Sequence, residues 1–174
     1  MALAQTSAQQ ETAPKHVTVL GSTGSVGSNT IDLIRRNPDQ FIVEALTANT
    51  NVEALAEQAK EFNAGMAVVA DPDKYQELKD ALAGTDIDVA AGPDALVEAA
   101  SRPADWVMAS IVGTAGLPPT LAAVRRGAVI GLANKECLVS AGDFMLREIE
   151  AHGATMLPVD SEHKSNTQKI QNKV

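Results

Sequence analysis

The chain has 174 residues, of which 45% are hydrophobic and 3% aromatic, and it carries a formal net charge of -8. This length suits one well-buried domain and leaves no room for a second of full size, while the scarcity of aromatic residues favours α/β packing over an aromatic-rich β-sandwich. The acidic balance argues against a general binder of nucleic acid or of an anionic membrane, so neither partner is expected, and an anionic ligand would need a dedicated cradle.

The beginning of the chain contains no targeting pattern. Residues 1–14 have neither an apolar run nor a basic start, which predicts a disordered leader and no secretory signal. Cys137 is the only cysteine, so no internal disulfide can form. No apolar run approaches the length of a membrane span. We therefore expect a cytoplasmic protein without a membrane partner.

Short β-branched runs alternate with helical patterns from residue 15 onward. The candidate strands are residues 16–21, 41–48, 66–70, 87–92, 105–112, 128–133 and 154–159. The candidate helices run through residues 31–36, 51–62, 72–82, 93–100, 117–126 and 144–153. Strands that alternate with helices are joined by right-handed crossovers, which predicts a doubly wound α/β fold: a mainly parallel sheet with helices on both faces. We assign it to residues 15–163, followed by a polar tail, 164–174.

Three glycines lie between the first strand and the first helix, in VTVLGSTGSVGSNTIDLI. Gly21 allows a tight turn, Gly24 lets the backbone approach a pyrophosphate and Gly27 lets the helix pack on the strand, while the helix N-terminus offers N–H groups to phosphates. The spacing is GxxGxxG, one residue longer than the usual GxGxxG, and its place after the first strand strengthens an otherwise weak signal. This Rossmann-like turn predicts a dinucleotide site; the alternative is a glycine-rich turn without a ligand.

The second strand ends in LTANTN, without an acidic residue. An Asp or Glu at that place would bind the ribose 2′-hydroxyl of NAD and repel a 2′-phosphate. Asn49, Thr50 and Asn51 are neutral hydrogen-bonding groups instead, which modestly favours NADP over NAD because no Arg or Lys is there to neutralise the phosphate. A helix N-cap formed by Thr50 or Asn51 is an equally good interpretation, and it is compatible with ligand contact.

Polar residues also follow two later strands. Asn134, Lys135 and Glu136 combine an amide, a cation and a carboxylate that could hold a phosphorylated or hydroxylated substrate, or could be surface groups at a helix start. Asp160 and Glu162 follow the last strand, and in an extended chain both side chains point to one side, where they could hold Mg²⁺ or Mn²⁺. Such an ion needs about six ligands, so water or substrate would supply the others. The alternative is a surface D-x-E sequence.

Together, VLGSTGSVG, ANKE and LPVDSEH resemble the motifs of the 1-deoxy-D-xylulose 5-phosphate reductoisomerase family, over residues 16–163. The cofactor contacts expected from the turn and from this resemblance are Gly21, Thr23, Gly24, Ser25, Val26, Asn49, Thr50, Asn51, Asn134 and Glu136. The resemblance further implies substrate contacts at Lys135, Ser161 and Glu162, metal ligands at Asp160 and Glu162, and catalytic roles for Lys135, Asp160 and Glu162. Asn49 and Thr50 stand where many members carry Gly and Lys, which weakens the expected NADP selectivity.

The resemblance implies an NADPH- and divalent-metal-dependent conversion of 1-deoxy-D-xylulose 5-phosphate, a small phosphorylated ketose, to 2-C-methyl-D-erythritol 4-phosphate in isoprenoid biosynthesis. Family members are usually homodimers. In the family, the DSEH segment leads into a connecting and catalytic domain, whereas KSNTQKIQNKV forms no recognisable continuation. We therefore expect a truncated cofactor domain that binds nucleotide with little or no turnover. The alternative is a non-catalytic NADP-binding module, or a subunit completed by another chain.

Overall fold

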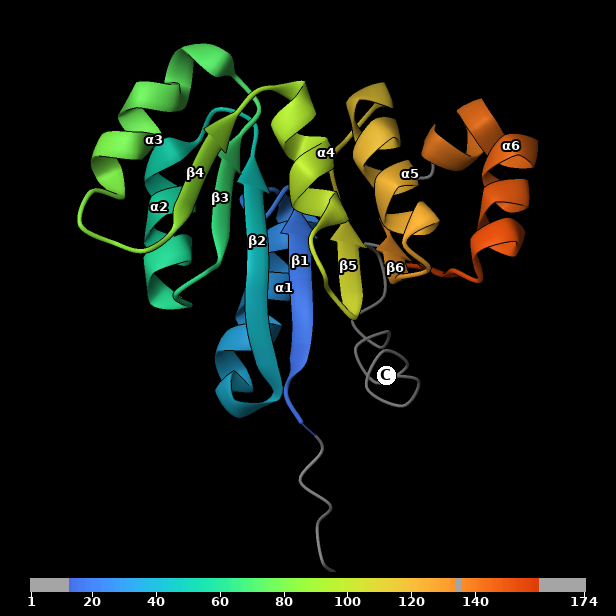
Figure 1. The fold of residues 1–174 in the computed structure, drawn as a ribbon, viewed down its shortest axis with the longest axis horizontal. Coiled ribbons are helices and arrows are strands. Elements are labelled where there is room, and N and C mark those ends of the chain that lie inside the picture. The colour runs from blue at the N-terminus through green and yellow to red at the C-terminus, as the bar shows by residue number, and fades with distance from the viewer. Residues whose placement is uncertain (1–12, 134–135, 160–174) are drawn as a thin grey trace, which may run out of the picture.

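The computed structural model describes residues 13–133 and 136–159, and, for residues 136–140, the backbone alone. These residues form a parallel seven-stranded sheet in the order β4-β3-β2-β1-β5-β6-β7 (Figure 1). The strands are β1 (Lys15–Leu20), β2 (Phe41–Ala48), β3 (Met66–Val69), β4 (Asp88–Ala91), β5 (Trp106–Ala109), β6 (Val129–Leu132) and β7 (Thr155–Pro158). The helices are α1 (Ser25–Arg36), α2 (Val52–Glu61), α3 (Tyr75–Ala81), α4 (Pro93–Ser101), α5 (Leu117–Arg125) and α6 (Glu136–His152).

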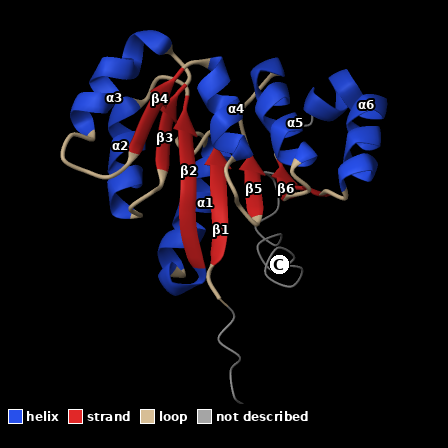
Figure 2. Cartoon of the chain, viewed as in Figure 1, coloured by secondary structure: helices blue, strands red, loops and turns tan. Residues whose placement is uncertain are grey.

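The chain winds outward from the middle of the sheet in both directions (Figure 2). It steps from β1 to β4 through α1, α2 and α3, crosses back over the sheet through α4, and then steps from β5 to β7 through α5 and α6. Helix α4 contacts β1, β2 and β3 on the face opposite α1 and α2. The predicted doubly wound, Rossmann-like fold is thus confirmed, with its topological switch point between β1 and β5.

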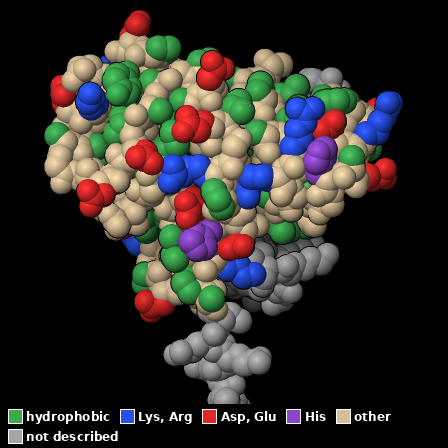
Figure 3. Space-filling view, viewed as in Figure 1, with side chains coloured by type: hydrophobic (Ala, Val, Ile, Leu, Met, Phe, Trp, Pro, Cys, Tyr) green, Lys and Arg blue, Asp and Glu red, His purple; other side chains and the backbone are tan. Residues whose placement is uncertain are grey.

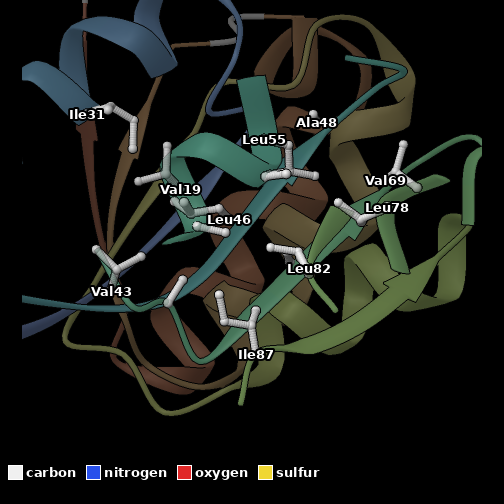
Figure 4. Close-up of a cluster of buried hydrophobic side chains, with 14 of the residues drawn as sticks. Val19, Ile31, Val43, Leu46, Ala48, Leu55, Val69, Leu78, Leu82 and Ile87 are labelled. Atoms are coloured by element: carbon white, nitrogen blue, oxygen red, sulfur yellow. The ribbon is translucent and has the colours of Figure 1, made fainter. Parts of the chain in front are cut away.

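The sheet is buried on both faces. Val17 and Val19 of β1 belong to one hydrophobic cluster with Ile31 of α1 and Leu55 of α2, part of which Figure 4 shows. Leu20 belongs to a second cluster on the other face, with residues of β5, β6 and the helices α5 and α6. Each fully buried aliphatic side chain of this kind contributes about 1.5–3 kcal/mol relative to an exposed one. Strands covered on both faces explain the continuous apolar runs in the sequence.

All predicted strands and helices are present, with three clear differences in extent. Helix α1 begins at Ser25, earlier than the predicted 31, so Gly27 lies inside the helix and not before it. The strand predicted to reach residue 112 ends at Ala109, because Ser110 turns to β1 and donates hydrogen bonds from its N and Oγ to Leu20 O at 3.0 and 2.7 Å. Helix α6 begins at Glu136, earlier than the predicted 144, and is interrupted at Ala141, whose φ of -137° and ψ of 22° are not helical. In the described part of the chain, no helix combines the length and the apolar character that a membrane crossing requires.

Candidate dinucleotide-binding site

The first and third glycines of the turn after β1 are required by the fold itself. Gly21 has φ of +84°, and a Cβ there would lie 3.1 Å from the carbonyl carbon and oxygen of Ser110. A Cβ on Gly27 would lie 2.0 Å from Gly21 O, which no real structure tolerates. These two glycines therefore let the turn bend and let α1 lie directly against it, as the sequence predicted.

The second glycine is different, because the protein does not need it. Gly24 has φ of -78° and ψ of 172°, which any residue adopts, and the nearest atom to an added Cβ would be Gly21 O at 3.5 Å, an ordinary contact. The residue is exposed and forms the N-cap of α1. A glycine without an internal requirement keeps the surface open for the close approach of an outside group.

The N-terminus of α1 beside Gly24 is suited to an anion. No side chain caps this helix in the described part of the chain, and its first turn holds no acidic residue. The amides of the first helical turn, which starts at Ser25 and Val26, have no intrahelical acceptors, and the helix dipole places partial positive charge at this end. A phosphate group facing the turn would therefore meet backbone donors and a favourable field.

Side chains from β2 and α2 hold the turn in place. Gly21 N donates to Thr47 Oγ1 at 2.8 Å, and Ser22 N donates to Thr47 O at 2.7 Å. Ser22 Oγ donates to Gln58 Oε1 at 2.7 Å, and Gln58 Nε2 donates to Ser22 O at 3.4 Å. Ser22 and Thr47 are fully buried. None of Ser22, Thr47 and Gln58 belongs to a motif that predicts a binding site from sequence. The available signal was a polar residue within an otherwise apolar strand or helix face.

The predicted ribose segment lies beyond the carboxyl end of β2. Asn49, Thr50 and Asn51 are all exposed. Asn51 Oδ1 accepts a hydrogen bond from Ala54 N at 3.1 Å, which confirms the N-cap interpretation for Asn51 and leaves Thr50 without that role. Within the described residues, the side chains of Asn49 and Thr50 have no hydrogen-bond partner. Both are therefore available to a ligand at this edge.

The loop after β5 borders the glycine turn. Gly21 lies against Ser110 and Ile111, and Ser110 Oγ contacts Gly21 O at 3.2 Å. Val112 is 83% exposed, the most exposed of the large hydrophobic side chains in the described residues. The switch-point edge of the sheet thus combines backbone donors at the turn, two free polar side chains after β2 and an apolar side chain after β5. That combination suits a ligand with phosphate, sugar and ring components.

An ion pair joins the two helices that flank the turn. Arg35 Nε and Nη2 of α1 donate to Glu61 Oε1 and Oε2 of α2 at 2.5 and 2.7 Å. The hydrogen bond from Arg35 holds the pKa of the Glu61 carboxyl below its ordinary value, against the opposing effect of burial. The pair joins α1 and α2 near their carboxyl ends, about one helical turn after Gln58 along α2.

Six predicted site residues cannot be placed by side chain. Asn134, Lys135, Asp160, Ser161 and Glu162 lie outside the described residues, and Glu136 begins α6 with its backbone alone described. The preceding strands end in the expected place, since Ala133 N donates to Ala109 O and Val159 N to Leu132 O. Among the described residues no group of His, Cys, Asp and Glu could hold a metal. The roles predicted for these six residues stay predictions.

Two cavities in the described structure lie away from the glycine turn. One of about 300 Å³ is at the amino end of the sheet and is lined by His16, Glu44, Asp105 and Arg126, among others. The other, of about 480 Å³, lies between α4 and α5. The face that Figure 3 shows carries acidic and basic side chains side by side. The ion pairs of the described structure include those of Arg102 with Glu44 and with Asp88.

Comparison with known proteins places the chain in one family. Residues 17–142 match the family model described as 1-deoxy-D-xylulose 5-phosphate reductoisomerase. The reductoisomerase of Rhodospirillum centenum is 63% identical over 151 residues, which are 87% of this chain and 38% of that protein. The corresponding protein of Zymomonas mobilis is 59% identical over 152 residues, 87% of this chain and 39% of that protein. The chain therefore spans roughly two fifths of the length of these relatives.

Solved structures of reductoisomerases share the fold. The enzyme from Zymomonas mobilis in complex with NADPH matches with a TM-score of 0.85 and 59% identity, over 89% of this chain and 41% of that one. A reductoisomerase in complex with NADPH, fosmidomycin and magnesium matches with a TM-score of 0.82 and 42% identity, over 88% of this chain and 38% of that one.

Proposed function

This chain belongs to the 1-deoxy-D-xylulose 5-phosphate reductoisomerase family, and we propose that its described domain binds NADPH. The observation that carries the proposal is that the fold requires a glycine at two of the three glycine positions of the turn and not at the third. The fold requires Gly21 and Gly27, whereas Gly24 is exposed and conformationally ordinary, with space for an approaching group at a helix N-terminus. The relative from Zymomonas mobilis was solved with NADPH, which supports the same ligand here.

In the proposed complex, the pyrophosphate lies over the turn. Its contacts are the backbone of Gly21, Thr23, Gly24, Ser25 and Val26. The adenosine ribose and its 2′-phosphate meet Asn49 and Thr50, whose side chains have no partner among the described residues. Asn51 serves mainly as the cap of α2 and can contribute its remaining amide N–H groups.

We further propose Asn134 and Glu136 as cofactor contacts, because they follow β6, whose carboxyl end lies at the same edge of the sheet.

For the whole enzyme we propose the reductive isomerisation of 1-deoxy-D-xylulose 5-phosphate to 2-C-methyl-D-erythritol 4-phosphate, an oxidoreductase reaction of isoprenoid biosynthesis. Lys135, Ser161 and Glu162 would hold the phosphorylated ketose, and Asp160 and Glu162 a divalent cation. Lys135, Asp160 and Glu162 are the proposed catalytic residues. When bound, NADPH supplies the hydride and a Mg²⁺ or Mn²⁺ ion polarises substrate oxygens.

In the proposed function, turnover requires a further region of the family in addition to this chain. The relatives are more than twice as long as the matched region. We propose that this domain binds nucleotide and that the part of the relatives which this chain does not cover completes the catalytic site. Homodimer assembly and a cytoplasmic location stay predictions. A non-catalytic nucleotide-binding module is the competing function, and it predicts no gain in activity when a separately produced carboxyl-terminal family domain is added.

The direct test is a fluorescence titration of the folded chain with NADPH and, in parallel, NADH. We expect saturable binding that favours NADPH, and turnover only after addition of the carboxyl-terminal family region that this chain does not cover. A folded chain that binds neither nucleotide would refute the proposed function.

A further inference from the structure

The side-chain amide of Gln58 makes two hydrogen bonds to one residue of the glycine turn. Its Oε1 accepts from Ser22 Oγ at 2.7 Å, and its Nε2 donates to Ser22 O at 3.4 Å. Ser22 is fully buried, so both of these polar groups would be costly to leave without partners. The contact joins residues 36 positions apart in the sequence.

Ser22 is the part of the turn through which neighbouring elements fix its shape. Its N–H is bound to Thr47 O at the end of β2, and its carbonyl also receives Ser28 Oγ at 3.5 Å. Two residues later the chain reaches Gly24, the proposed contact for the pyrophosphate. A change in the orientation of the Ser22 peptide would therefore move the amides that face the phosphates, although α1 itself could stay in place.

We propose that Gln58 is a positioning residue for the dinucleotide: it fixes the Gly21–Gly24 turn in the geometry that receives the pyrophosphate. The inference rests on the proposed function. A primary amide is suited to this place because its oxygen can accept a hydrogen bond from the hydroxyl of Ser22 while its nitrogen donates to the carbonyl. Gln58 is half-buried on α2, two helical turns after the cap residue Asn51, so it links the turn to the helix that follows the ribose segment.

Gln58→Met tests this role, since Met has similar length and makes neither hydrogen bond. If the turn is held less firmly, the binding-competent population falls and the apparent affinity falls with it. We expect about tenfold weaker NADP⁺ binding by calorimetry, equivalent to about 1.4 kcal/mol. Ser22→Ala, which removes one of the two bonds from the other side, should weaken binding in the same direction. Gln40→Met, at an exposed position before β2, is the matched control and should bind normally.

A second ligand separates positioning of the turn from a general loss of structure. Adenosine 2′-monophosphate carries the ribose phosphate but has no pyrophosphate, so its affinity, measured by NMR titration, should change less than twofold in Gln58→Met. Equal weakening of both ligands, or normal NADP⁺ binding by both variants, would overturn the role of Gln58. If the wild-type chain bound no NADP⁺ at all, the proposed function would fail first, and the positioning role with it.

Discussion

Substitution of the second and third glycines by alanine should separate ligand contact from folding. In Gly24→Ala the new methyl group has space, because its nearest neighbour would be at 3.5 Å. Alanine restricts the unfolded chain, which stabilises by about 0.4–1 kcal/mol, but it is a poorer N-cap than glycine by a similar amount. We therefore expect the free energy of unfolding to change by less than about 0.5 kcal/mol, the difference between these two effects.

The same methyl group would stand where the pyrophosphate approaches. Loss of one hydrogen bond from a backbone amide to a charged phosphate costs about 1.5–3 kcal/mol, which corresponds to about ten- to hundredfold weaker NADPH binding. In Gly27→Ala, by contrast, the Cβ would lie 2.0 Å from Gly21 O and 2.7 Å from Ser22 Cα. These are backbone atoms, so the turn or α1 must move, and overpacking of this kind costs about 1–3 kcal/mol or more.

The assay combines urea unfolding, followed by circular dichroism, with a fluorescence titration of NADPH. Gly142→Ala is the matched control: it lies in α6, and its added Cβ meets nothing within 4 Å. It should bind NADPH as the wild type does. Normal binding by Gly24→Ala would refute the proposed approach of the pyrophosphate at that residue, and wild-type stability of Gly27→Ala would refute the close packing of α1 on the turn.

Three further substitutions test the supports of the site. Thr47→Val removes the hydroxyl that accepts from the turn and leaves the part-buried N–H of Gly21 unpaired, so urea unfolding should show a loss of about 1–3 kcal/mol, with weaker NADPH binding. Asn51→Ala removes the cap of α2 and should cost about 0.5–2 kcal/mol in the same measurement.

The pKa of Glu61 is lowered in the folded state by Arg35, so its contribution to stability is present above the unfolded pKa and is lost as the pH falls through the folded one. Glu61→Gln should accordingly destabilise at pH 7 and have less effect in melting curves below about pH 4, whereas an equal effect at both pH values would contradict this linkage.

The sequence was sufficient for the fold because the central strands are covered on both faces. A strand such as β3, whose four residues are all buried, appears as an uninterrupted apolar run, and the glycine turn marks the first crossover. The end of β5 was not predictable in the same way, since Ser110 leaves the strand to bind the carbonyls of Leu20 and Gly21, a contact between distant segments. The interruption of α6 at Ala141 likewise has no equivalent in the hydrophobic pattern.

The residues of the candidate site also fall into two groups, those that local sequence could predict and those that depend on contacts between distant segments. Gly21 and Gly27 were predictable because steric demands on a turn are local and act through the absence of a side chain. Ser22, Thr47 and Gln58 were not, because their importance depends on which hydroxyl meets which amide across 26 to 36 residues of chain. A glycine motif alone thus specifies that the backbone can bend toward a phosphate. Side chains from β2 and α2 determine the conformation in which the turn is held. Two chains with the same glycines and different residues at positions 22, 47 and 58 should therefore differ in affinity for the pyrophosphate, even where the fold is identical.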